Sequence, residues 1–139
     1  YLAGELGSAV EVLDYDQQTG KFSHVQTIST IPATWDAHNG AAAIKISSDD
    51  HFVYVSNRGY DSLAVFKISS DGSLSLIQNI SVEGSFPRDF SLDPSESFVV
   101  CVNQNTDNAT LFSRSKETGK LSLLEKDVAV PEGVCVLFN

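Results

Sequence analysis

The sequence predicts an all-β fold: a β-propeller, of which this chain of 139 residues forms about three four-stranded antiparallel blades. Three observations predict it: an internal repeat, short strand-like runs separated by turn residues, and no helical period with capping residues. A shift of 46 positions places Phe52, Asn57, Asp61 and Phe66 on Phe98, Asn103, Asp107 and Phe112. Periods of about 40 to 50 residues built from short strands are typical of propeller blades.

A third copy of the repeat lies upstream. At an offset of 53, Tyr1 and Val12 match Tyr54 and Val65, and at an offset of 52, Gly20 and Gln26 match Gly72 and Gln78. Propellers typically close with four to eight blades. We therefore expect this chain to be part of a single propeller domain, completed by remaining blades on the same or another chain.

The middle copy, 41–82, is expected to be a full blade. Its strands are predicted at 41–47, 52–56, 62–68 and 74–82. The run 52–56 is almost continuously apolar, which is typical of a strand buried on both faces. The sequence Ser70-Asp71-Gly72-Ser73 is a strong hairpin signal before the fourth strand.

The flanking copies complete the pattern. The copy at 87–128 is predicted to be a full blade, with strands at 87–92, 98–102, 109–113 and 121–127. The copy at 1–30 is predicted to lack its first strand and to hold strands at 1–3, 10–15 and 22–29. A lone closing strand is predicted at 133–138. Because a ring can close with such a strand, we expect the C-terminal portion of a propeller.

Composition restricts the partners of the chain. The net charge is −9 and the sequence pI is about 4.5, which argues against nucleic acid and against anionic membrane surfaces as partners. There is no apolar run of 18 residues and no signal-peptide pattern at the start. Two cysteines, Cys101 and Cys135, lie in apolar runs and are expected to be buried, reduced thiols. We expect a cytoplasmic protein, and the absence of Met is consistent with a fragment.

Several segments resemble a known family. They are Tyr1-Leu2-Ala3-Gly4-Glu5-Leu6, the run 54–66, Phe86-Pro87-Arg88-Asp89-Phe90 with Asp93-Pro94, and the run 130–136. Together they resemble the seven-bladed propeller lactonases, which include propeller-type 6-phosphogluconolactonases and are related to carboxymuconate-lactonizing enzymes. The resemblance covers the whole chain in unbroken order. It implies the C-terminal portion of such a ring and hydrolysis of a phosphorylated sugar lactone.

Three charged residues are the main candidates for the site. By the repeat, Glu5 and Arg58 occupy equivalent loops between second and third strands, and Arg88 begins a first strand, which lines the channel. We expect the three to converge at one opening and to bind a small anionic lactone. Arginine can bind phosphate or carboxylate through two hydrogen bonds and can stabilise an oxyanion. The alternative is that the arginines form structural ion pairs with Asp61 or Asp89, and that Glu5 is a solvated loop charge or a partner of one of them.

The connection 31–40 is longer than its counterpart between the next two copies, and it adds two candidates. His38 is an alternative to Glu5 as general base, although isolated loop histidines are common. Trp35 is predicted either to stack on a sugar ring or to pack within the loop. Glu83 lies just before the strand of Arg88 and is a weaker candidate for substrate binding.

Other chemistries have little support in the sequence. There is no Gly-x-Ser-x-Gly motif, no Cys-x-x-Cys and no histidine pair at metal-ligand spacing, so we expect no metal and no cofactor. Three functions stay open: metal-independent lactone hydrolysis, a lactonizing isomerase acting on a muconate-like dicarboxylate, and a non-catalytic propeller that binds a partner on its rim.

Overall fold

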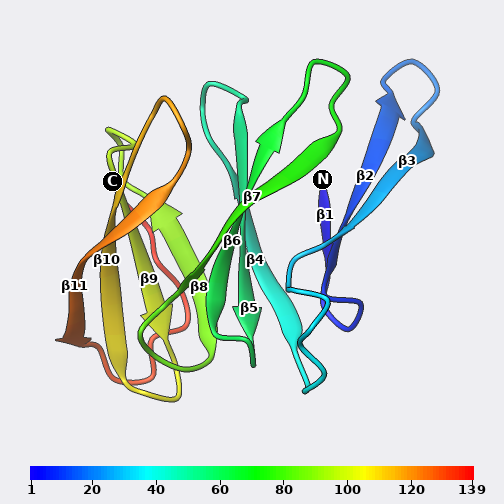
Figure 1. Ribbon diagram of the computed structural model, residues 1–139. Coiled ribbons are helices and arrows are strands. Elements are labelled where there is room, and N and C mark those ends of the chain that lie inside the picture. Colours follow the sequence, from blue (N-terminus) through cyan, green and yellow to red (C-terminus); the bar gives the residue numbers. More distant parts are fainter.

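The computed structural model describes residues 1–139 and consists of eleven strands in three antiparallel sheets, with no helix (Figure 1). The first sheet holds β1 (Leu2–Gly4), β2 (Ala9–Asp16) and β3 (Lys21–Ser29). The second holds β4 (Gly40–Ile46), β5 (Phe52–Arg58), β6 (Ser62–Ile68) and β7 (Leu74–Ser81). The third holds β8 (Pro87–Leu92), β9 (Phe98–Asn103), β10 (Asn108–Arg114) and β11 (Leu121–Ala129). The prediction of an all-β fold with blade-like sheets is confirmed.

No element of the structure is a helix that could cross a membrane.

The predicted closing strand at 133–138 is wrong, because these residues form no strand. The segment runs beside the third sheet, where the amide of Val136 donates to Oδ2 of Asp89 at 2.9 Å. A first strand pairs with the second strand of its own blade, and this chain contains no further blade to receive it. The assignment of the chain to the C-terminal portion of a ring drew on this strand and is not retained. Cys135, in the same segment, is exposed rather than buried, whereas Cys101 is buried.

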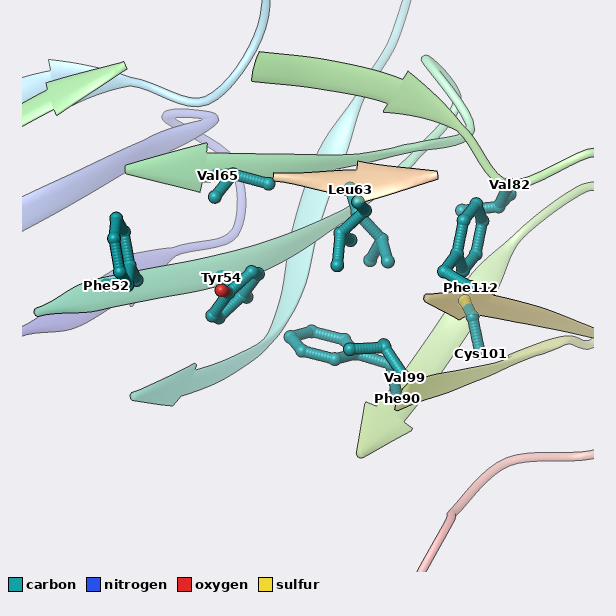
Figure 2. Packing of buried hydrophobic residues seen from close by; sticks show 10 residues of the cluster. Phe52, Tyr54, Leu63, Val65, Val82, Phe90, Val99, Cys101 and Phe112 are labelled. Carbon is teal, nitrogen blue, oxygen red and sulfur yellow. The ribbon is translucent and has the colours of Figure 1, made fainter. Parts of the chain in front are cut away.

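The second sheet is apolar on both faces because its neighbours cover both. Phe52 and Tyr54 of β5 belong to a core shared with the third sheet, which also includes Phe90 and Phe112 (Figure 2). Val53 and Val55 of β5 point the other way, into a core shared with the first sheet. Successive residues of a strand face opposite sides, so the continuous apolar run of β5 follows from burial between two neighbours.

A glutamine in the last strand of one sheet joins it to the next sheet. The side chain of Gln26 donates to the carbonyl oxygen of Leu74 at 3.0 Å and accepts from the amide of Leu74 at 2.8 Å. Gln78, its equivalent in the repeat, makes the same two bonds to Leu121, both at 2.8 Å. We call this contact the glutamine bridge. It holds neighbouring sheets at a repeated spacing.

Two tyrosine hydroxyls also donate to backbone carbonyls of the next sheet. The hydroxyl of Tyr1 donates to the carbonyl of Gly72 at 2.7 Å, and that of Tyr54 to the carbonyl of Gly119 at 2.8 Å. The Tyr54 hydroxyl also accepts from Nε of Arg114 at 2.6 Å. Burial is the main cause that raises the pKa of Tyr54, so this hydroxyl stays a donor.

Five loops gather at one end of the sheets, the lower end in Figure 1. They are the turns after β1, β5 and β9 and the connections from β3 to β4 and from β7 to β8, which comprise residues 5–8, 59–61, 104–107, 30–39 and 82–86. We call this end the loop rim. Buried asparagines fasten its connections: Nδ2 of Asn57 donates to the carbonyl of Thr30 at 3.0 Å, and Nδ2 of Asn103 to that of Val82 at 3.4 Å.

Replacing Gln78 by Ala should lower the free energy of unfolding by about 1–3 kcal/mol, because both backbone groups of Leu121 lose their partner at the glutamine bridge. Urea unfolding measures the change. The matched control is Gln17→Ala in the exposed turn between β2 and β3, which should change stability by less than about 0.5 kcal/mol. Equal effects of the two substitutions would contradict the bridging role.

The two thiols should react at very different rates. Burial raises the pKa of the Cys101 thiol far above its usual value, while Cys135 is exposed. We expect a disulfide reagent at neutral pH to modify one thiol in the folded chain and both in denaturant. Modification of both at equal rates under native conditions would contradict the burial of Cys101.

Candidate active site at the loop rim

Arg58 and Glu5 meet at the loop rim and form an ion pair, which is the alternative role expected for Glu5. Arg58 ends β5 and Glu5 begins the turn after β1, and Nη2 of Arg58 lies 2.5 Å from Oε1 of Glu5. The same Nη2 is 3.4 Å from the carbonyl oxygen of Ala41 in β4. The arginine side chain is only 12% exposed, whereas that of the glutamate is 62% exposed. The pair therefore presents a nearly buried guanidinium and an open carboxylate.

A residue of the connection to the third sheet also contacts this guanidinium. Cζ of Arg58 lies 5.1 Å from the centroid of the Phe86 ring, in the connection from β7 to β8. Nε of Arg58 is buried without a hydrogen-bond partner, and Nη1 makes no hydrogen bond within the chain. The fork of Arg58 is thus held along one edge by Glu5 and Ala41, and its Nη1 donors are free.

Arg88 is the unpaired cation of the rim. It is exposed near the start of β8, and the register of β8 and β9 shifts between Pro87 and Asp89, which makes Arg88 the extra residue of a β-bulge. Asp89 pairs instead with Lys45, at 3.6 Å. Arg88 forms no ion pair and no hydrogen bond within the chain. The expected alternative, in which Asp89 neutralises Arg88, is absent from the structure.

Asp61 does not pair with Arg58 either. Its Oδ1 accepts hydrogen bonds from the amide of Gly59 at 3.1 Å and from the amide of Phe86 at 2.9 Å. Asp61 therefore ties the turn after β5 to the connection that carries Phe86. It thereby positions both the turn that follows Arg58 and the residue whose ring lies over the Arg58 guanidinium.

His38 and Trp35 lie on the long connection before β4. His38 is exposed, its ring makes no hydrogen bond or ion pair, and its carbonyl oxygen packs against Gly59. Trp35 packs edge-on against Tyr60, with ring centroids 5.0 Å apart, and its Nε1 is buried without a partner. The indole is thus held by loop packing, the second of the two roles expected for it.

Glu83 is turned toward the perimeter. Its carboxylate lies 3.3 Å from Nζ of Lys126 in β11, the outermost strand of the third sheet. The structure does not bring it to the pair formed by Arg58 and Glu5.

Two concave regions of the surface contain none of the candidate residues. One, of about 230 Å³, is lined by Tyr1, Ile44, Lys45, Ile46 and Val53. The other, of about 510 Å³, lies between Tyr1, Val12, Leu13, Asp14, Val25, Asp71 and Gly72. Both border Tyr1, which precedes β1. No group of three or more His, Cys, Asp or Glu side chains gathers in a way that could hold a metal ion.

Phe86 is the rim residue that sequence reasoning missed. It stands within the motif Phe86-Pro87-Arg88-Asp89-Phe90, but a phenylalanine before a proline gives no signal of its own. Its unusual feature is a backbone φ of 64°, which only the structure reveals.

A family model described as a seven-bladed β-propeller lactonase matches residues 1–138. The chain belongs to this family. A crystal structure of a protein from Lactobacillus plantarum is similar to it, with 66% identity and a TM-score of 0.95 over 96% of this chain and 39% of that one. The periplasmic gluconolactonase of Pseudomonas aeruginosa shows 34% identity and a TM-score of 0.86 over 92% of this chain and 36% of that one.

Among curated relatives, the 6-phosphogluconolactonase of Bacillus subtilis is 44% identical over 139 residues, which is 99% of this chain and 40% of the relative. This lactonase-family chain thus spans about 40% of the length of the curated relatives it matches. Three sheets are the corresponding share of a seven-bladed ring.

Replacing Gly59 by Ala should destabilise the loop rim. Gly59 has φ of 118°, and an added Cβ would collide with the carbonyl of His38. We expect a loss of about 3 kcal/mol or more in urea unfolding. The control is Gly20→Ala, at φ of 69° with open space around it, which should cost about 1 kcal/mol. Equal losses would show that the contact with His38 contributes nothing.

Proposed function

We propose that this chain acts within a complete seven-bladed ring that hydrolyses a sugar lactone, with 6-phosphogluconolactone as the substrate. Membership of the lactonase family and the name of the Bacillus subtilis relative support the reaction class. The observation that carries the proposal is the held guanidinium of Arg58, with free Nη1 donors beside the open carboxylate of Glu5. The remaining blades, on the same or another chain, form the rest of the channel.

Arg58 is proposed as the oxyanion donor. A donor fixed before the reaction stabilises developing charge without reorganisation, and losing one such donor costs about 10²–10³ in kcat. The contacts of Arg58 with Glu5, Ala41 and Phe86 fix it in this way. Burial of its stem in the loop rim strengthens a hydrogen bond to an oxyanion, because the local dielectric is low.

Arg88 is proposed to anchor the phosphate. It is exposed and has no partner of its own, so an incoming dianion meets no competing carboxylate. A planar fork binds phosphate through two parallel hydrogen bonds. Arg88 is the extra residue of the bulge at the rim end of β8, which is an inner strand.

Glu5 is proposed as the general base. One of its oxygens is bound by Arg58, while Oε2 makes no hydrogen bond within the chain and the side chain is largely exposed. Water attacks the lactone carbonyl carbon, its proton passes to Glu5, and the negative charge on the carbonyl oxygen meets Arg58. The ring C–O bond then breaks, and the leaving oxygen takes the proton to give the open hydroxy acid. Such a base contributes about 10²–10⁴ in rate.

The other rim residues have smaller parts in the proposal. His38 is the second candidate for the base, and Trp35, in the connection that carries His38, packs against Tyr60. Glu83 is left out, because Lys126 holds it at the perimeter. We place the protein in the cytoplasm, where a phosphorylated sugar lactone is retained by its charge.

Two arginine variants of the complete ring test the two roles separately. Arg58→Gln should lower kcat by about 10² or more on both 6-phosphogluconolactone and unphosphorylated gluconolactone, because both pass through an oxyanion. Arg88→Ala should lower kcat/KM by about 10² on the phosphorylated lactone only. Steady-state hydrolysis rates, corrected for the spontaneous reaction, measure both.

Glu5→Gln and His38→Gln complete the design. Loss of about 10² or more in kcat is expected for Glu5→Gln, and a change of less than about threefold for His38→Gln. A complete ring that leaves the spontaneous hydrolysis rate unchanged would end the lactonase proposal. Conversion of a muconate without lactone hydrolysis would favour the lactonizing isomerase instead, and capture of a partner with no turnover would favour a binding module.

A further inference from the structure

We propose that Phe86 is a positioning residue that orients the guanidinium of Arg58 for catalysis. The inference rests on the proposed role of Arg58 as oxyanion donor. Phe86 does not contact the reacting atoms in this scheme. It acts through the face of its ring, 5.1 Å from Cζ of Arg58.

The internal repeat provides a comparison within the same chain. Phe86 and Glu132 occupy equivalent positions 46 residues apart, after equivalent fourth strands. Both have positive φ, 64° and 50°. Both donate their amide to an equivalent aspartate, Phe86 to Asp61 at 2.9 Å and Glu132 to Asp107 at 2.8 Å. The same backbone conformation therefore recurs at this position in both copies of the repeat.

This backbone conformation does not require phenylalanine at position 86. Glycine or asparagine adopts positive φ at the lowest cost, and a bulky side chain there is an outlier. The equivalent position carries a glutamate, so an aromatic ring is not needed to close the turn. What differs between the two copies is the residue at the end of the second strand: Arg58 ends β5, whereas its equivalent, directly after β9, is Gln104. The aromatic ring accompanies the guanidinium.

The aromatic ring of Phe86 completes the restraint on the Arg58 guanidinium. Glu5 and Ala41 bind only Nη2, which leaves the fork free to swing about that nitrogen. A cation lying over an aromatic face gains electrostatic attraction and loses freedom to rotate out of the plane. Asp61 holds the amides of both Gly59 and Phe86, so the arginine turn and the aromatic ring are fixed to the same carboxylate. Nη1 is then the only edge that can turn toward a substrate.

The kinetic test uses three variants of the complete ring. Phe86→Leu keeps an apolar side chain without a π face, and it should lower kcat on 6-phosphogluconolactone about tenfold with KM changed by less than about twofold. Phe86→Tyr keeps the π face and should restore kcat to within about twofold. Glu132→Ala, at the equivalent turn, is the control and should leave both constants unchanged.

A double-mutant cycle separates positioning from loss of structure. In the Arg58→Gln background, Phe86→Leu should change kcat by less than about twofold, because the group that it positions is gone. A tenfold loss that persists in this background would overturn the proposal, as would equal losses for the Leu and Tyr variants. Thermal unfolding of each variant confirms that it is folded.

A measurement on the Arg58 guanidinium itself tests the positioning role even if the complete propeller has no lactonase activity. In NMR spectra of the same ring, the Nε–H signal of Arg58 should exchange with solvent at least about fivefold faster in Phe86→Leu than in Phe86→Tyr. Inactivity of the wild-type ring with this difference intact would refute the proposed reaction but keep the positioning role. Equal exchange in both variants would refute the positioning role alone.

Discussion

Side-chain bonds from one sheet to the backbone of the next are the constraint on which the rest of this structure depends. The second sheet is apolar on both faces, so it is stable only between two neighbours. Hydrophobic packing is not directional and leaves the sheets free to slide. The glutamine bridges at Gln26 and Gln78 remove that freedom, because each offers a donor and an acceptor to a single residue of the next sheet. The contact between Glu5 and Arg58 crosses the same gap and needs this spacing.

The three arginines of the chain show how placement decides the role of one residue type. Arg114 is fully buried. Its Nε and Nη1 donate to Tyr54 and Glu96, which serves the packing of the second and third sheets, while its Nη2 is buried without a partner. Arg58 is nearly buried but has only part of its donors bound. Arg88 is exposed and has none bound. The share of unbound guanidinium donors therefore increases from Arg114 to Arg58 and from Arg58 to Arg88.

The repeat predicted most of the fold because each blade buries the same positions. Strands β4 to β11 lie within about two residues of the predicted ranges, and Glu5 and Arg58 meet because they occupy equivalent turns of adjacent blades. The segment 133–138 is apolar enough for a strand, but strand formation depends on a partner that periodicity cannot reveal. The contact of Phe86 with Arg58 was equally hidden, since it depends on a left-handed backbone at a bulky residue. Arg88 was placed correctly at the start of its strand, yet its lack of a partner follows from the pairing of Asp89 with Lys45.

The junction between the first two sheets departs from the repeat, and this departure is where the rim becomes asymmetric. Asp61 and Asp107 each hold the next connection with a carboxylate, but the equivalent residue of the first sheet is Ser8, which also has positive φ. The hydroxyl of Ser8 bonds instead to Asn39, at the end of the longer connection 30–39. Asn39 takes over the task, since its side chain donates to Ser8 at 2.9 Å and accepts from the amide of Tyr60 at 3.0 Å. The buried side chain of Asn39 thus links the turn after β1 to the turn after β5. The additional length of this connection carries Trp35, which packs on Tyr60, and the exposed His38.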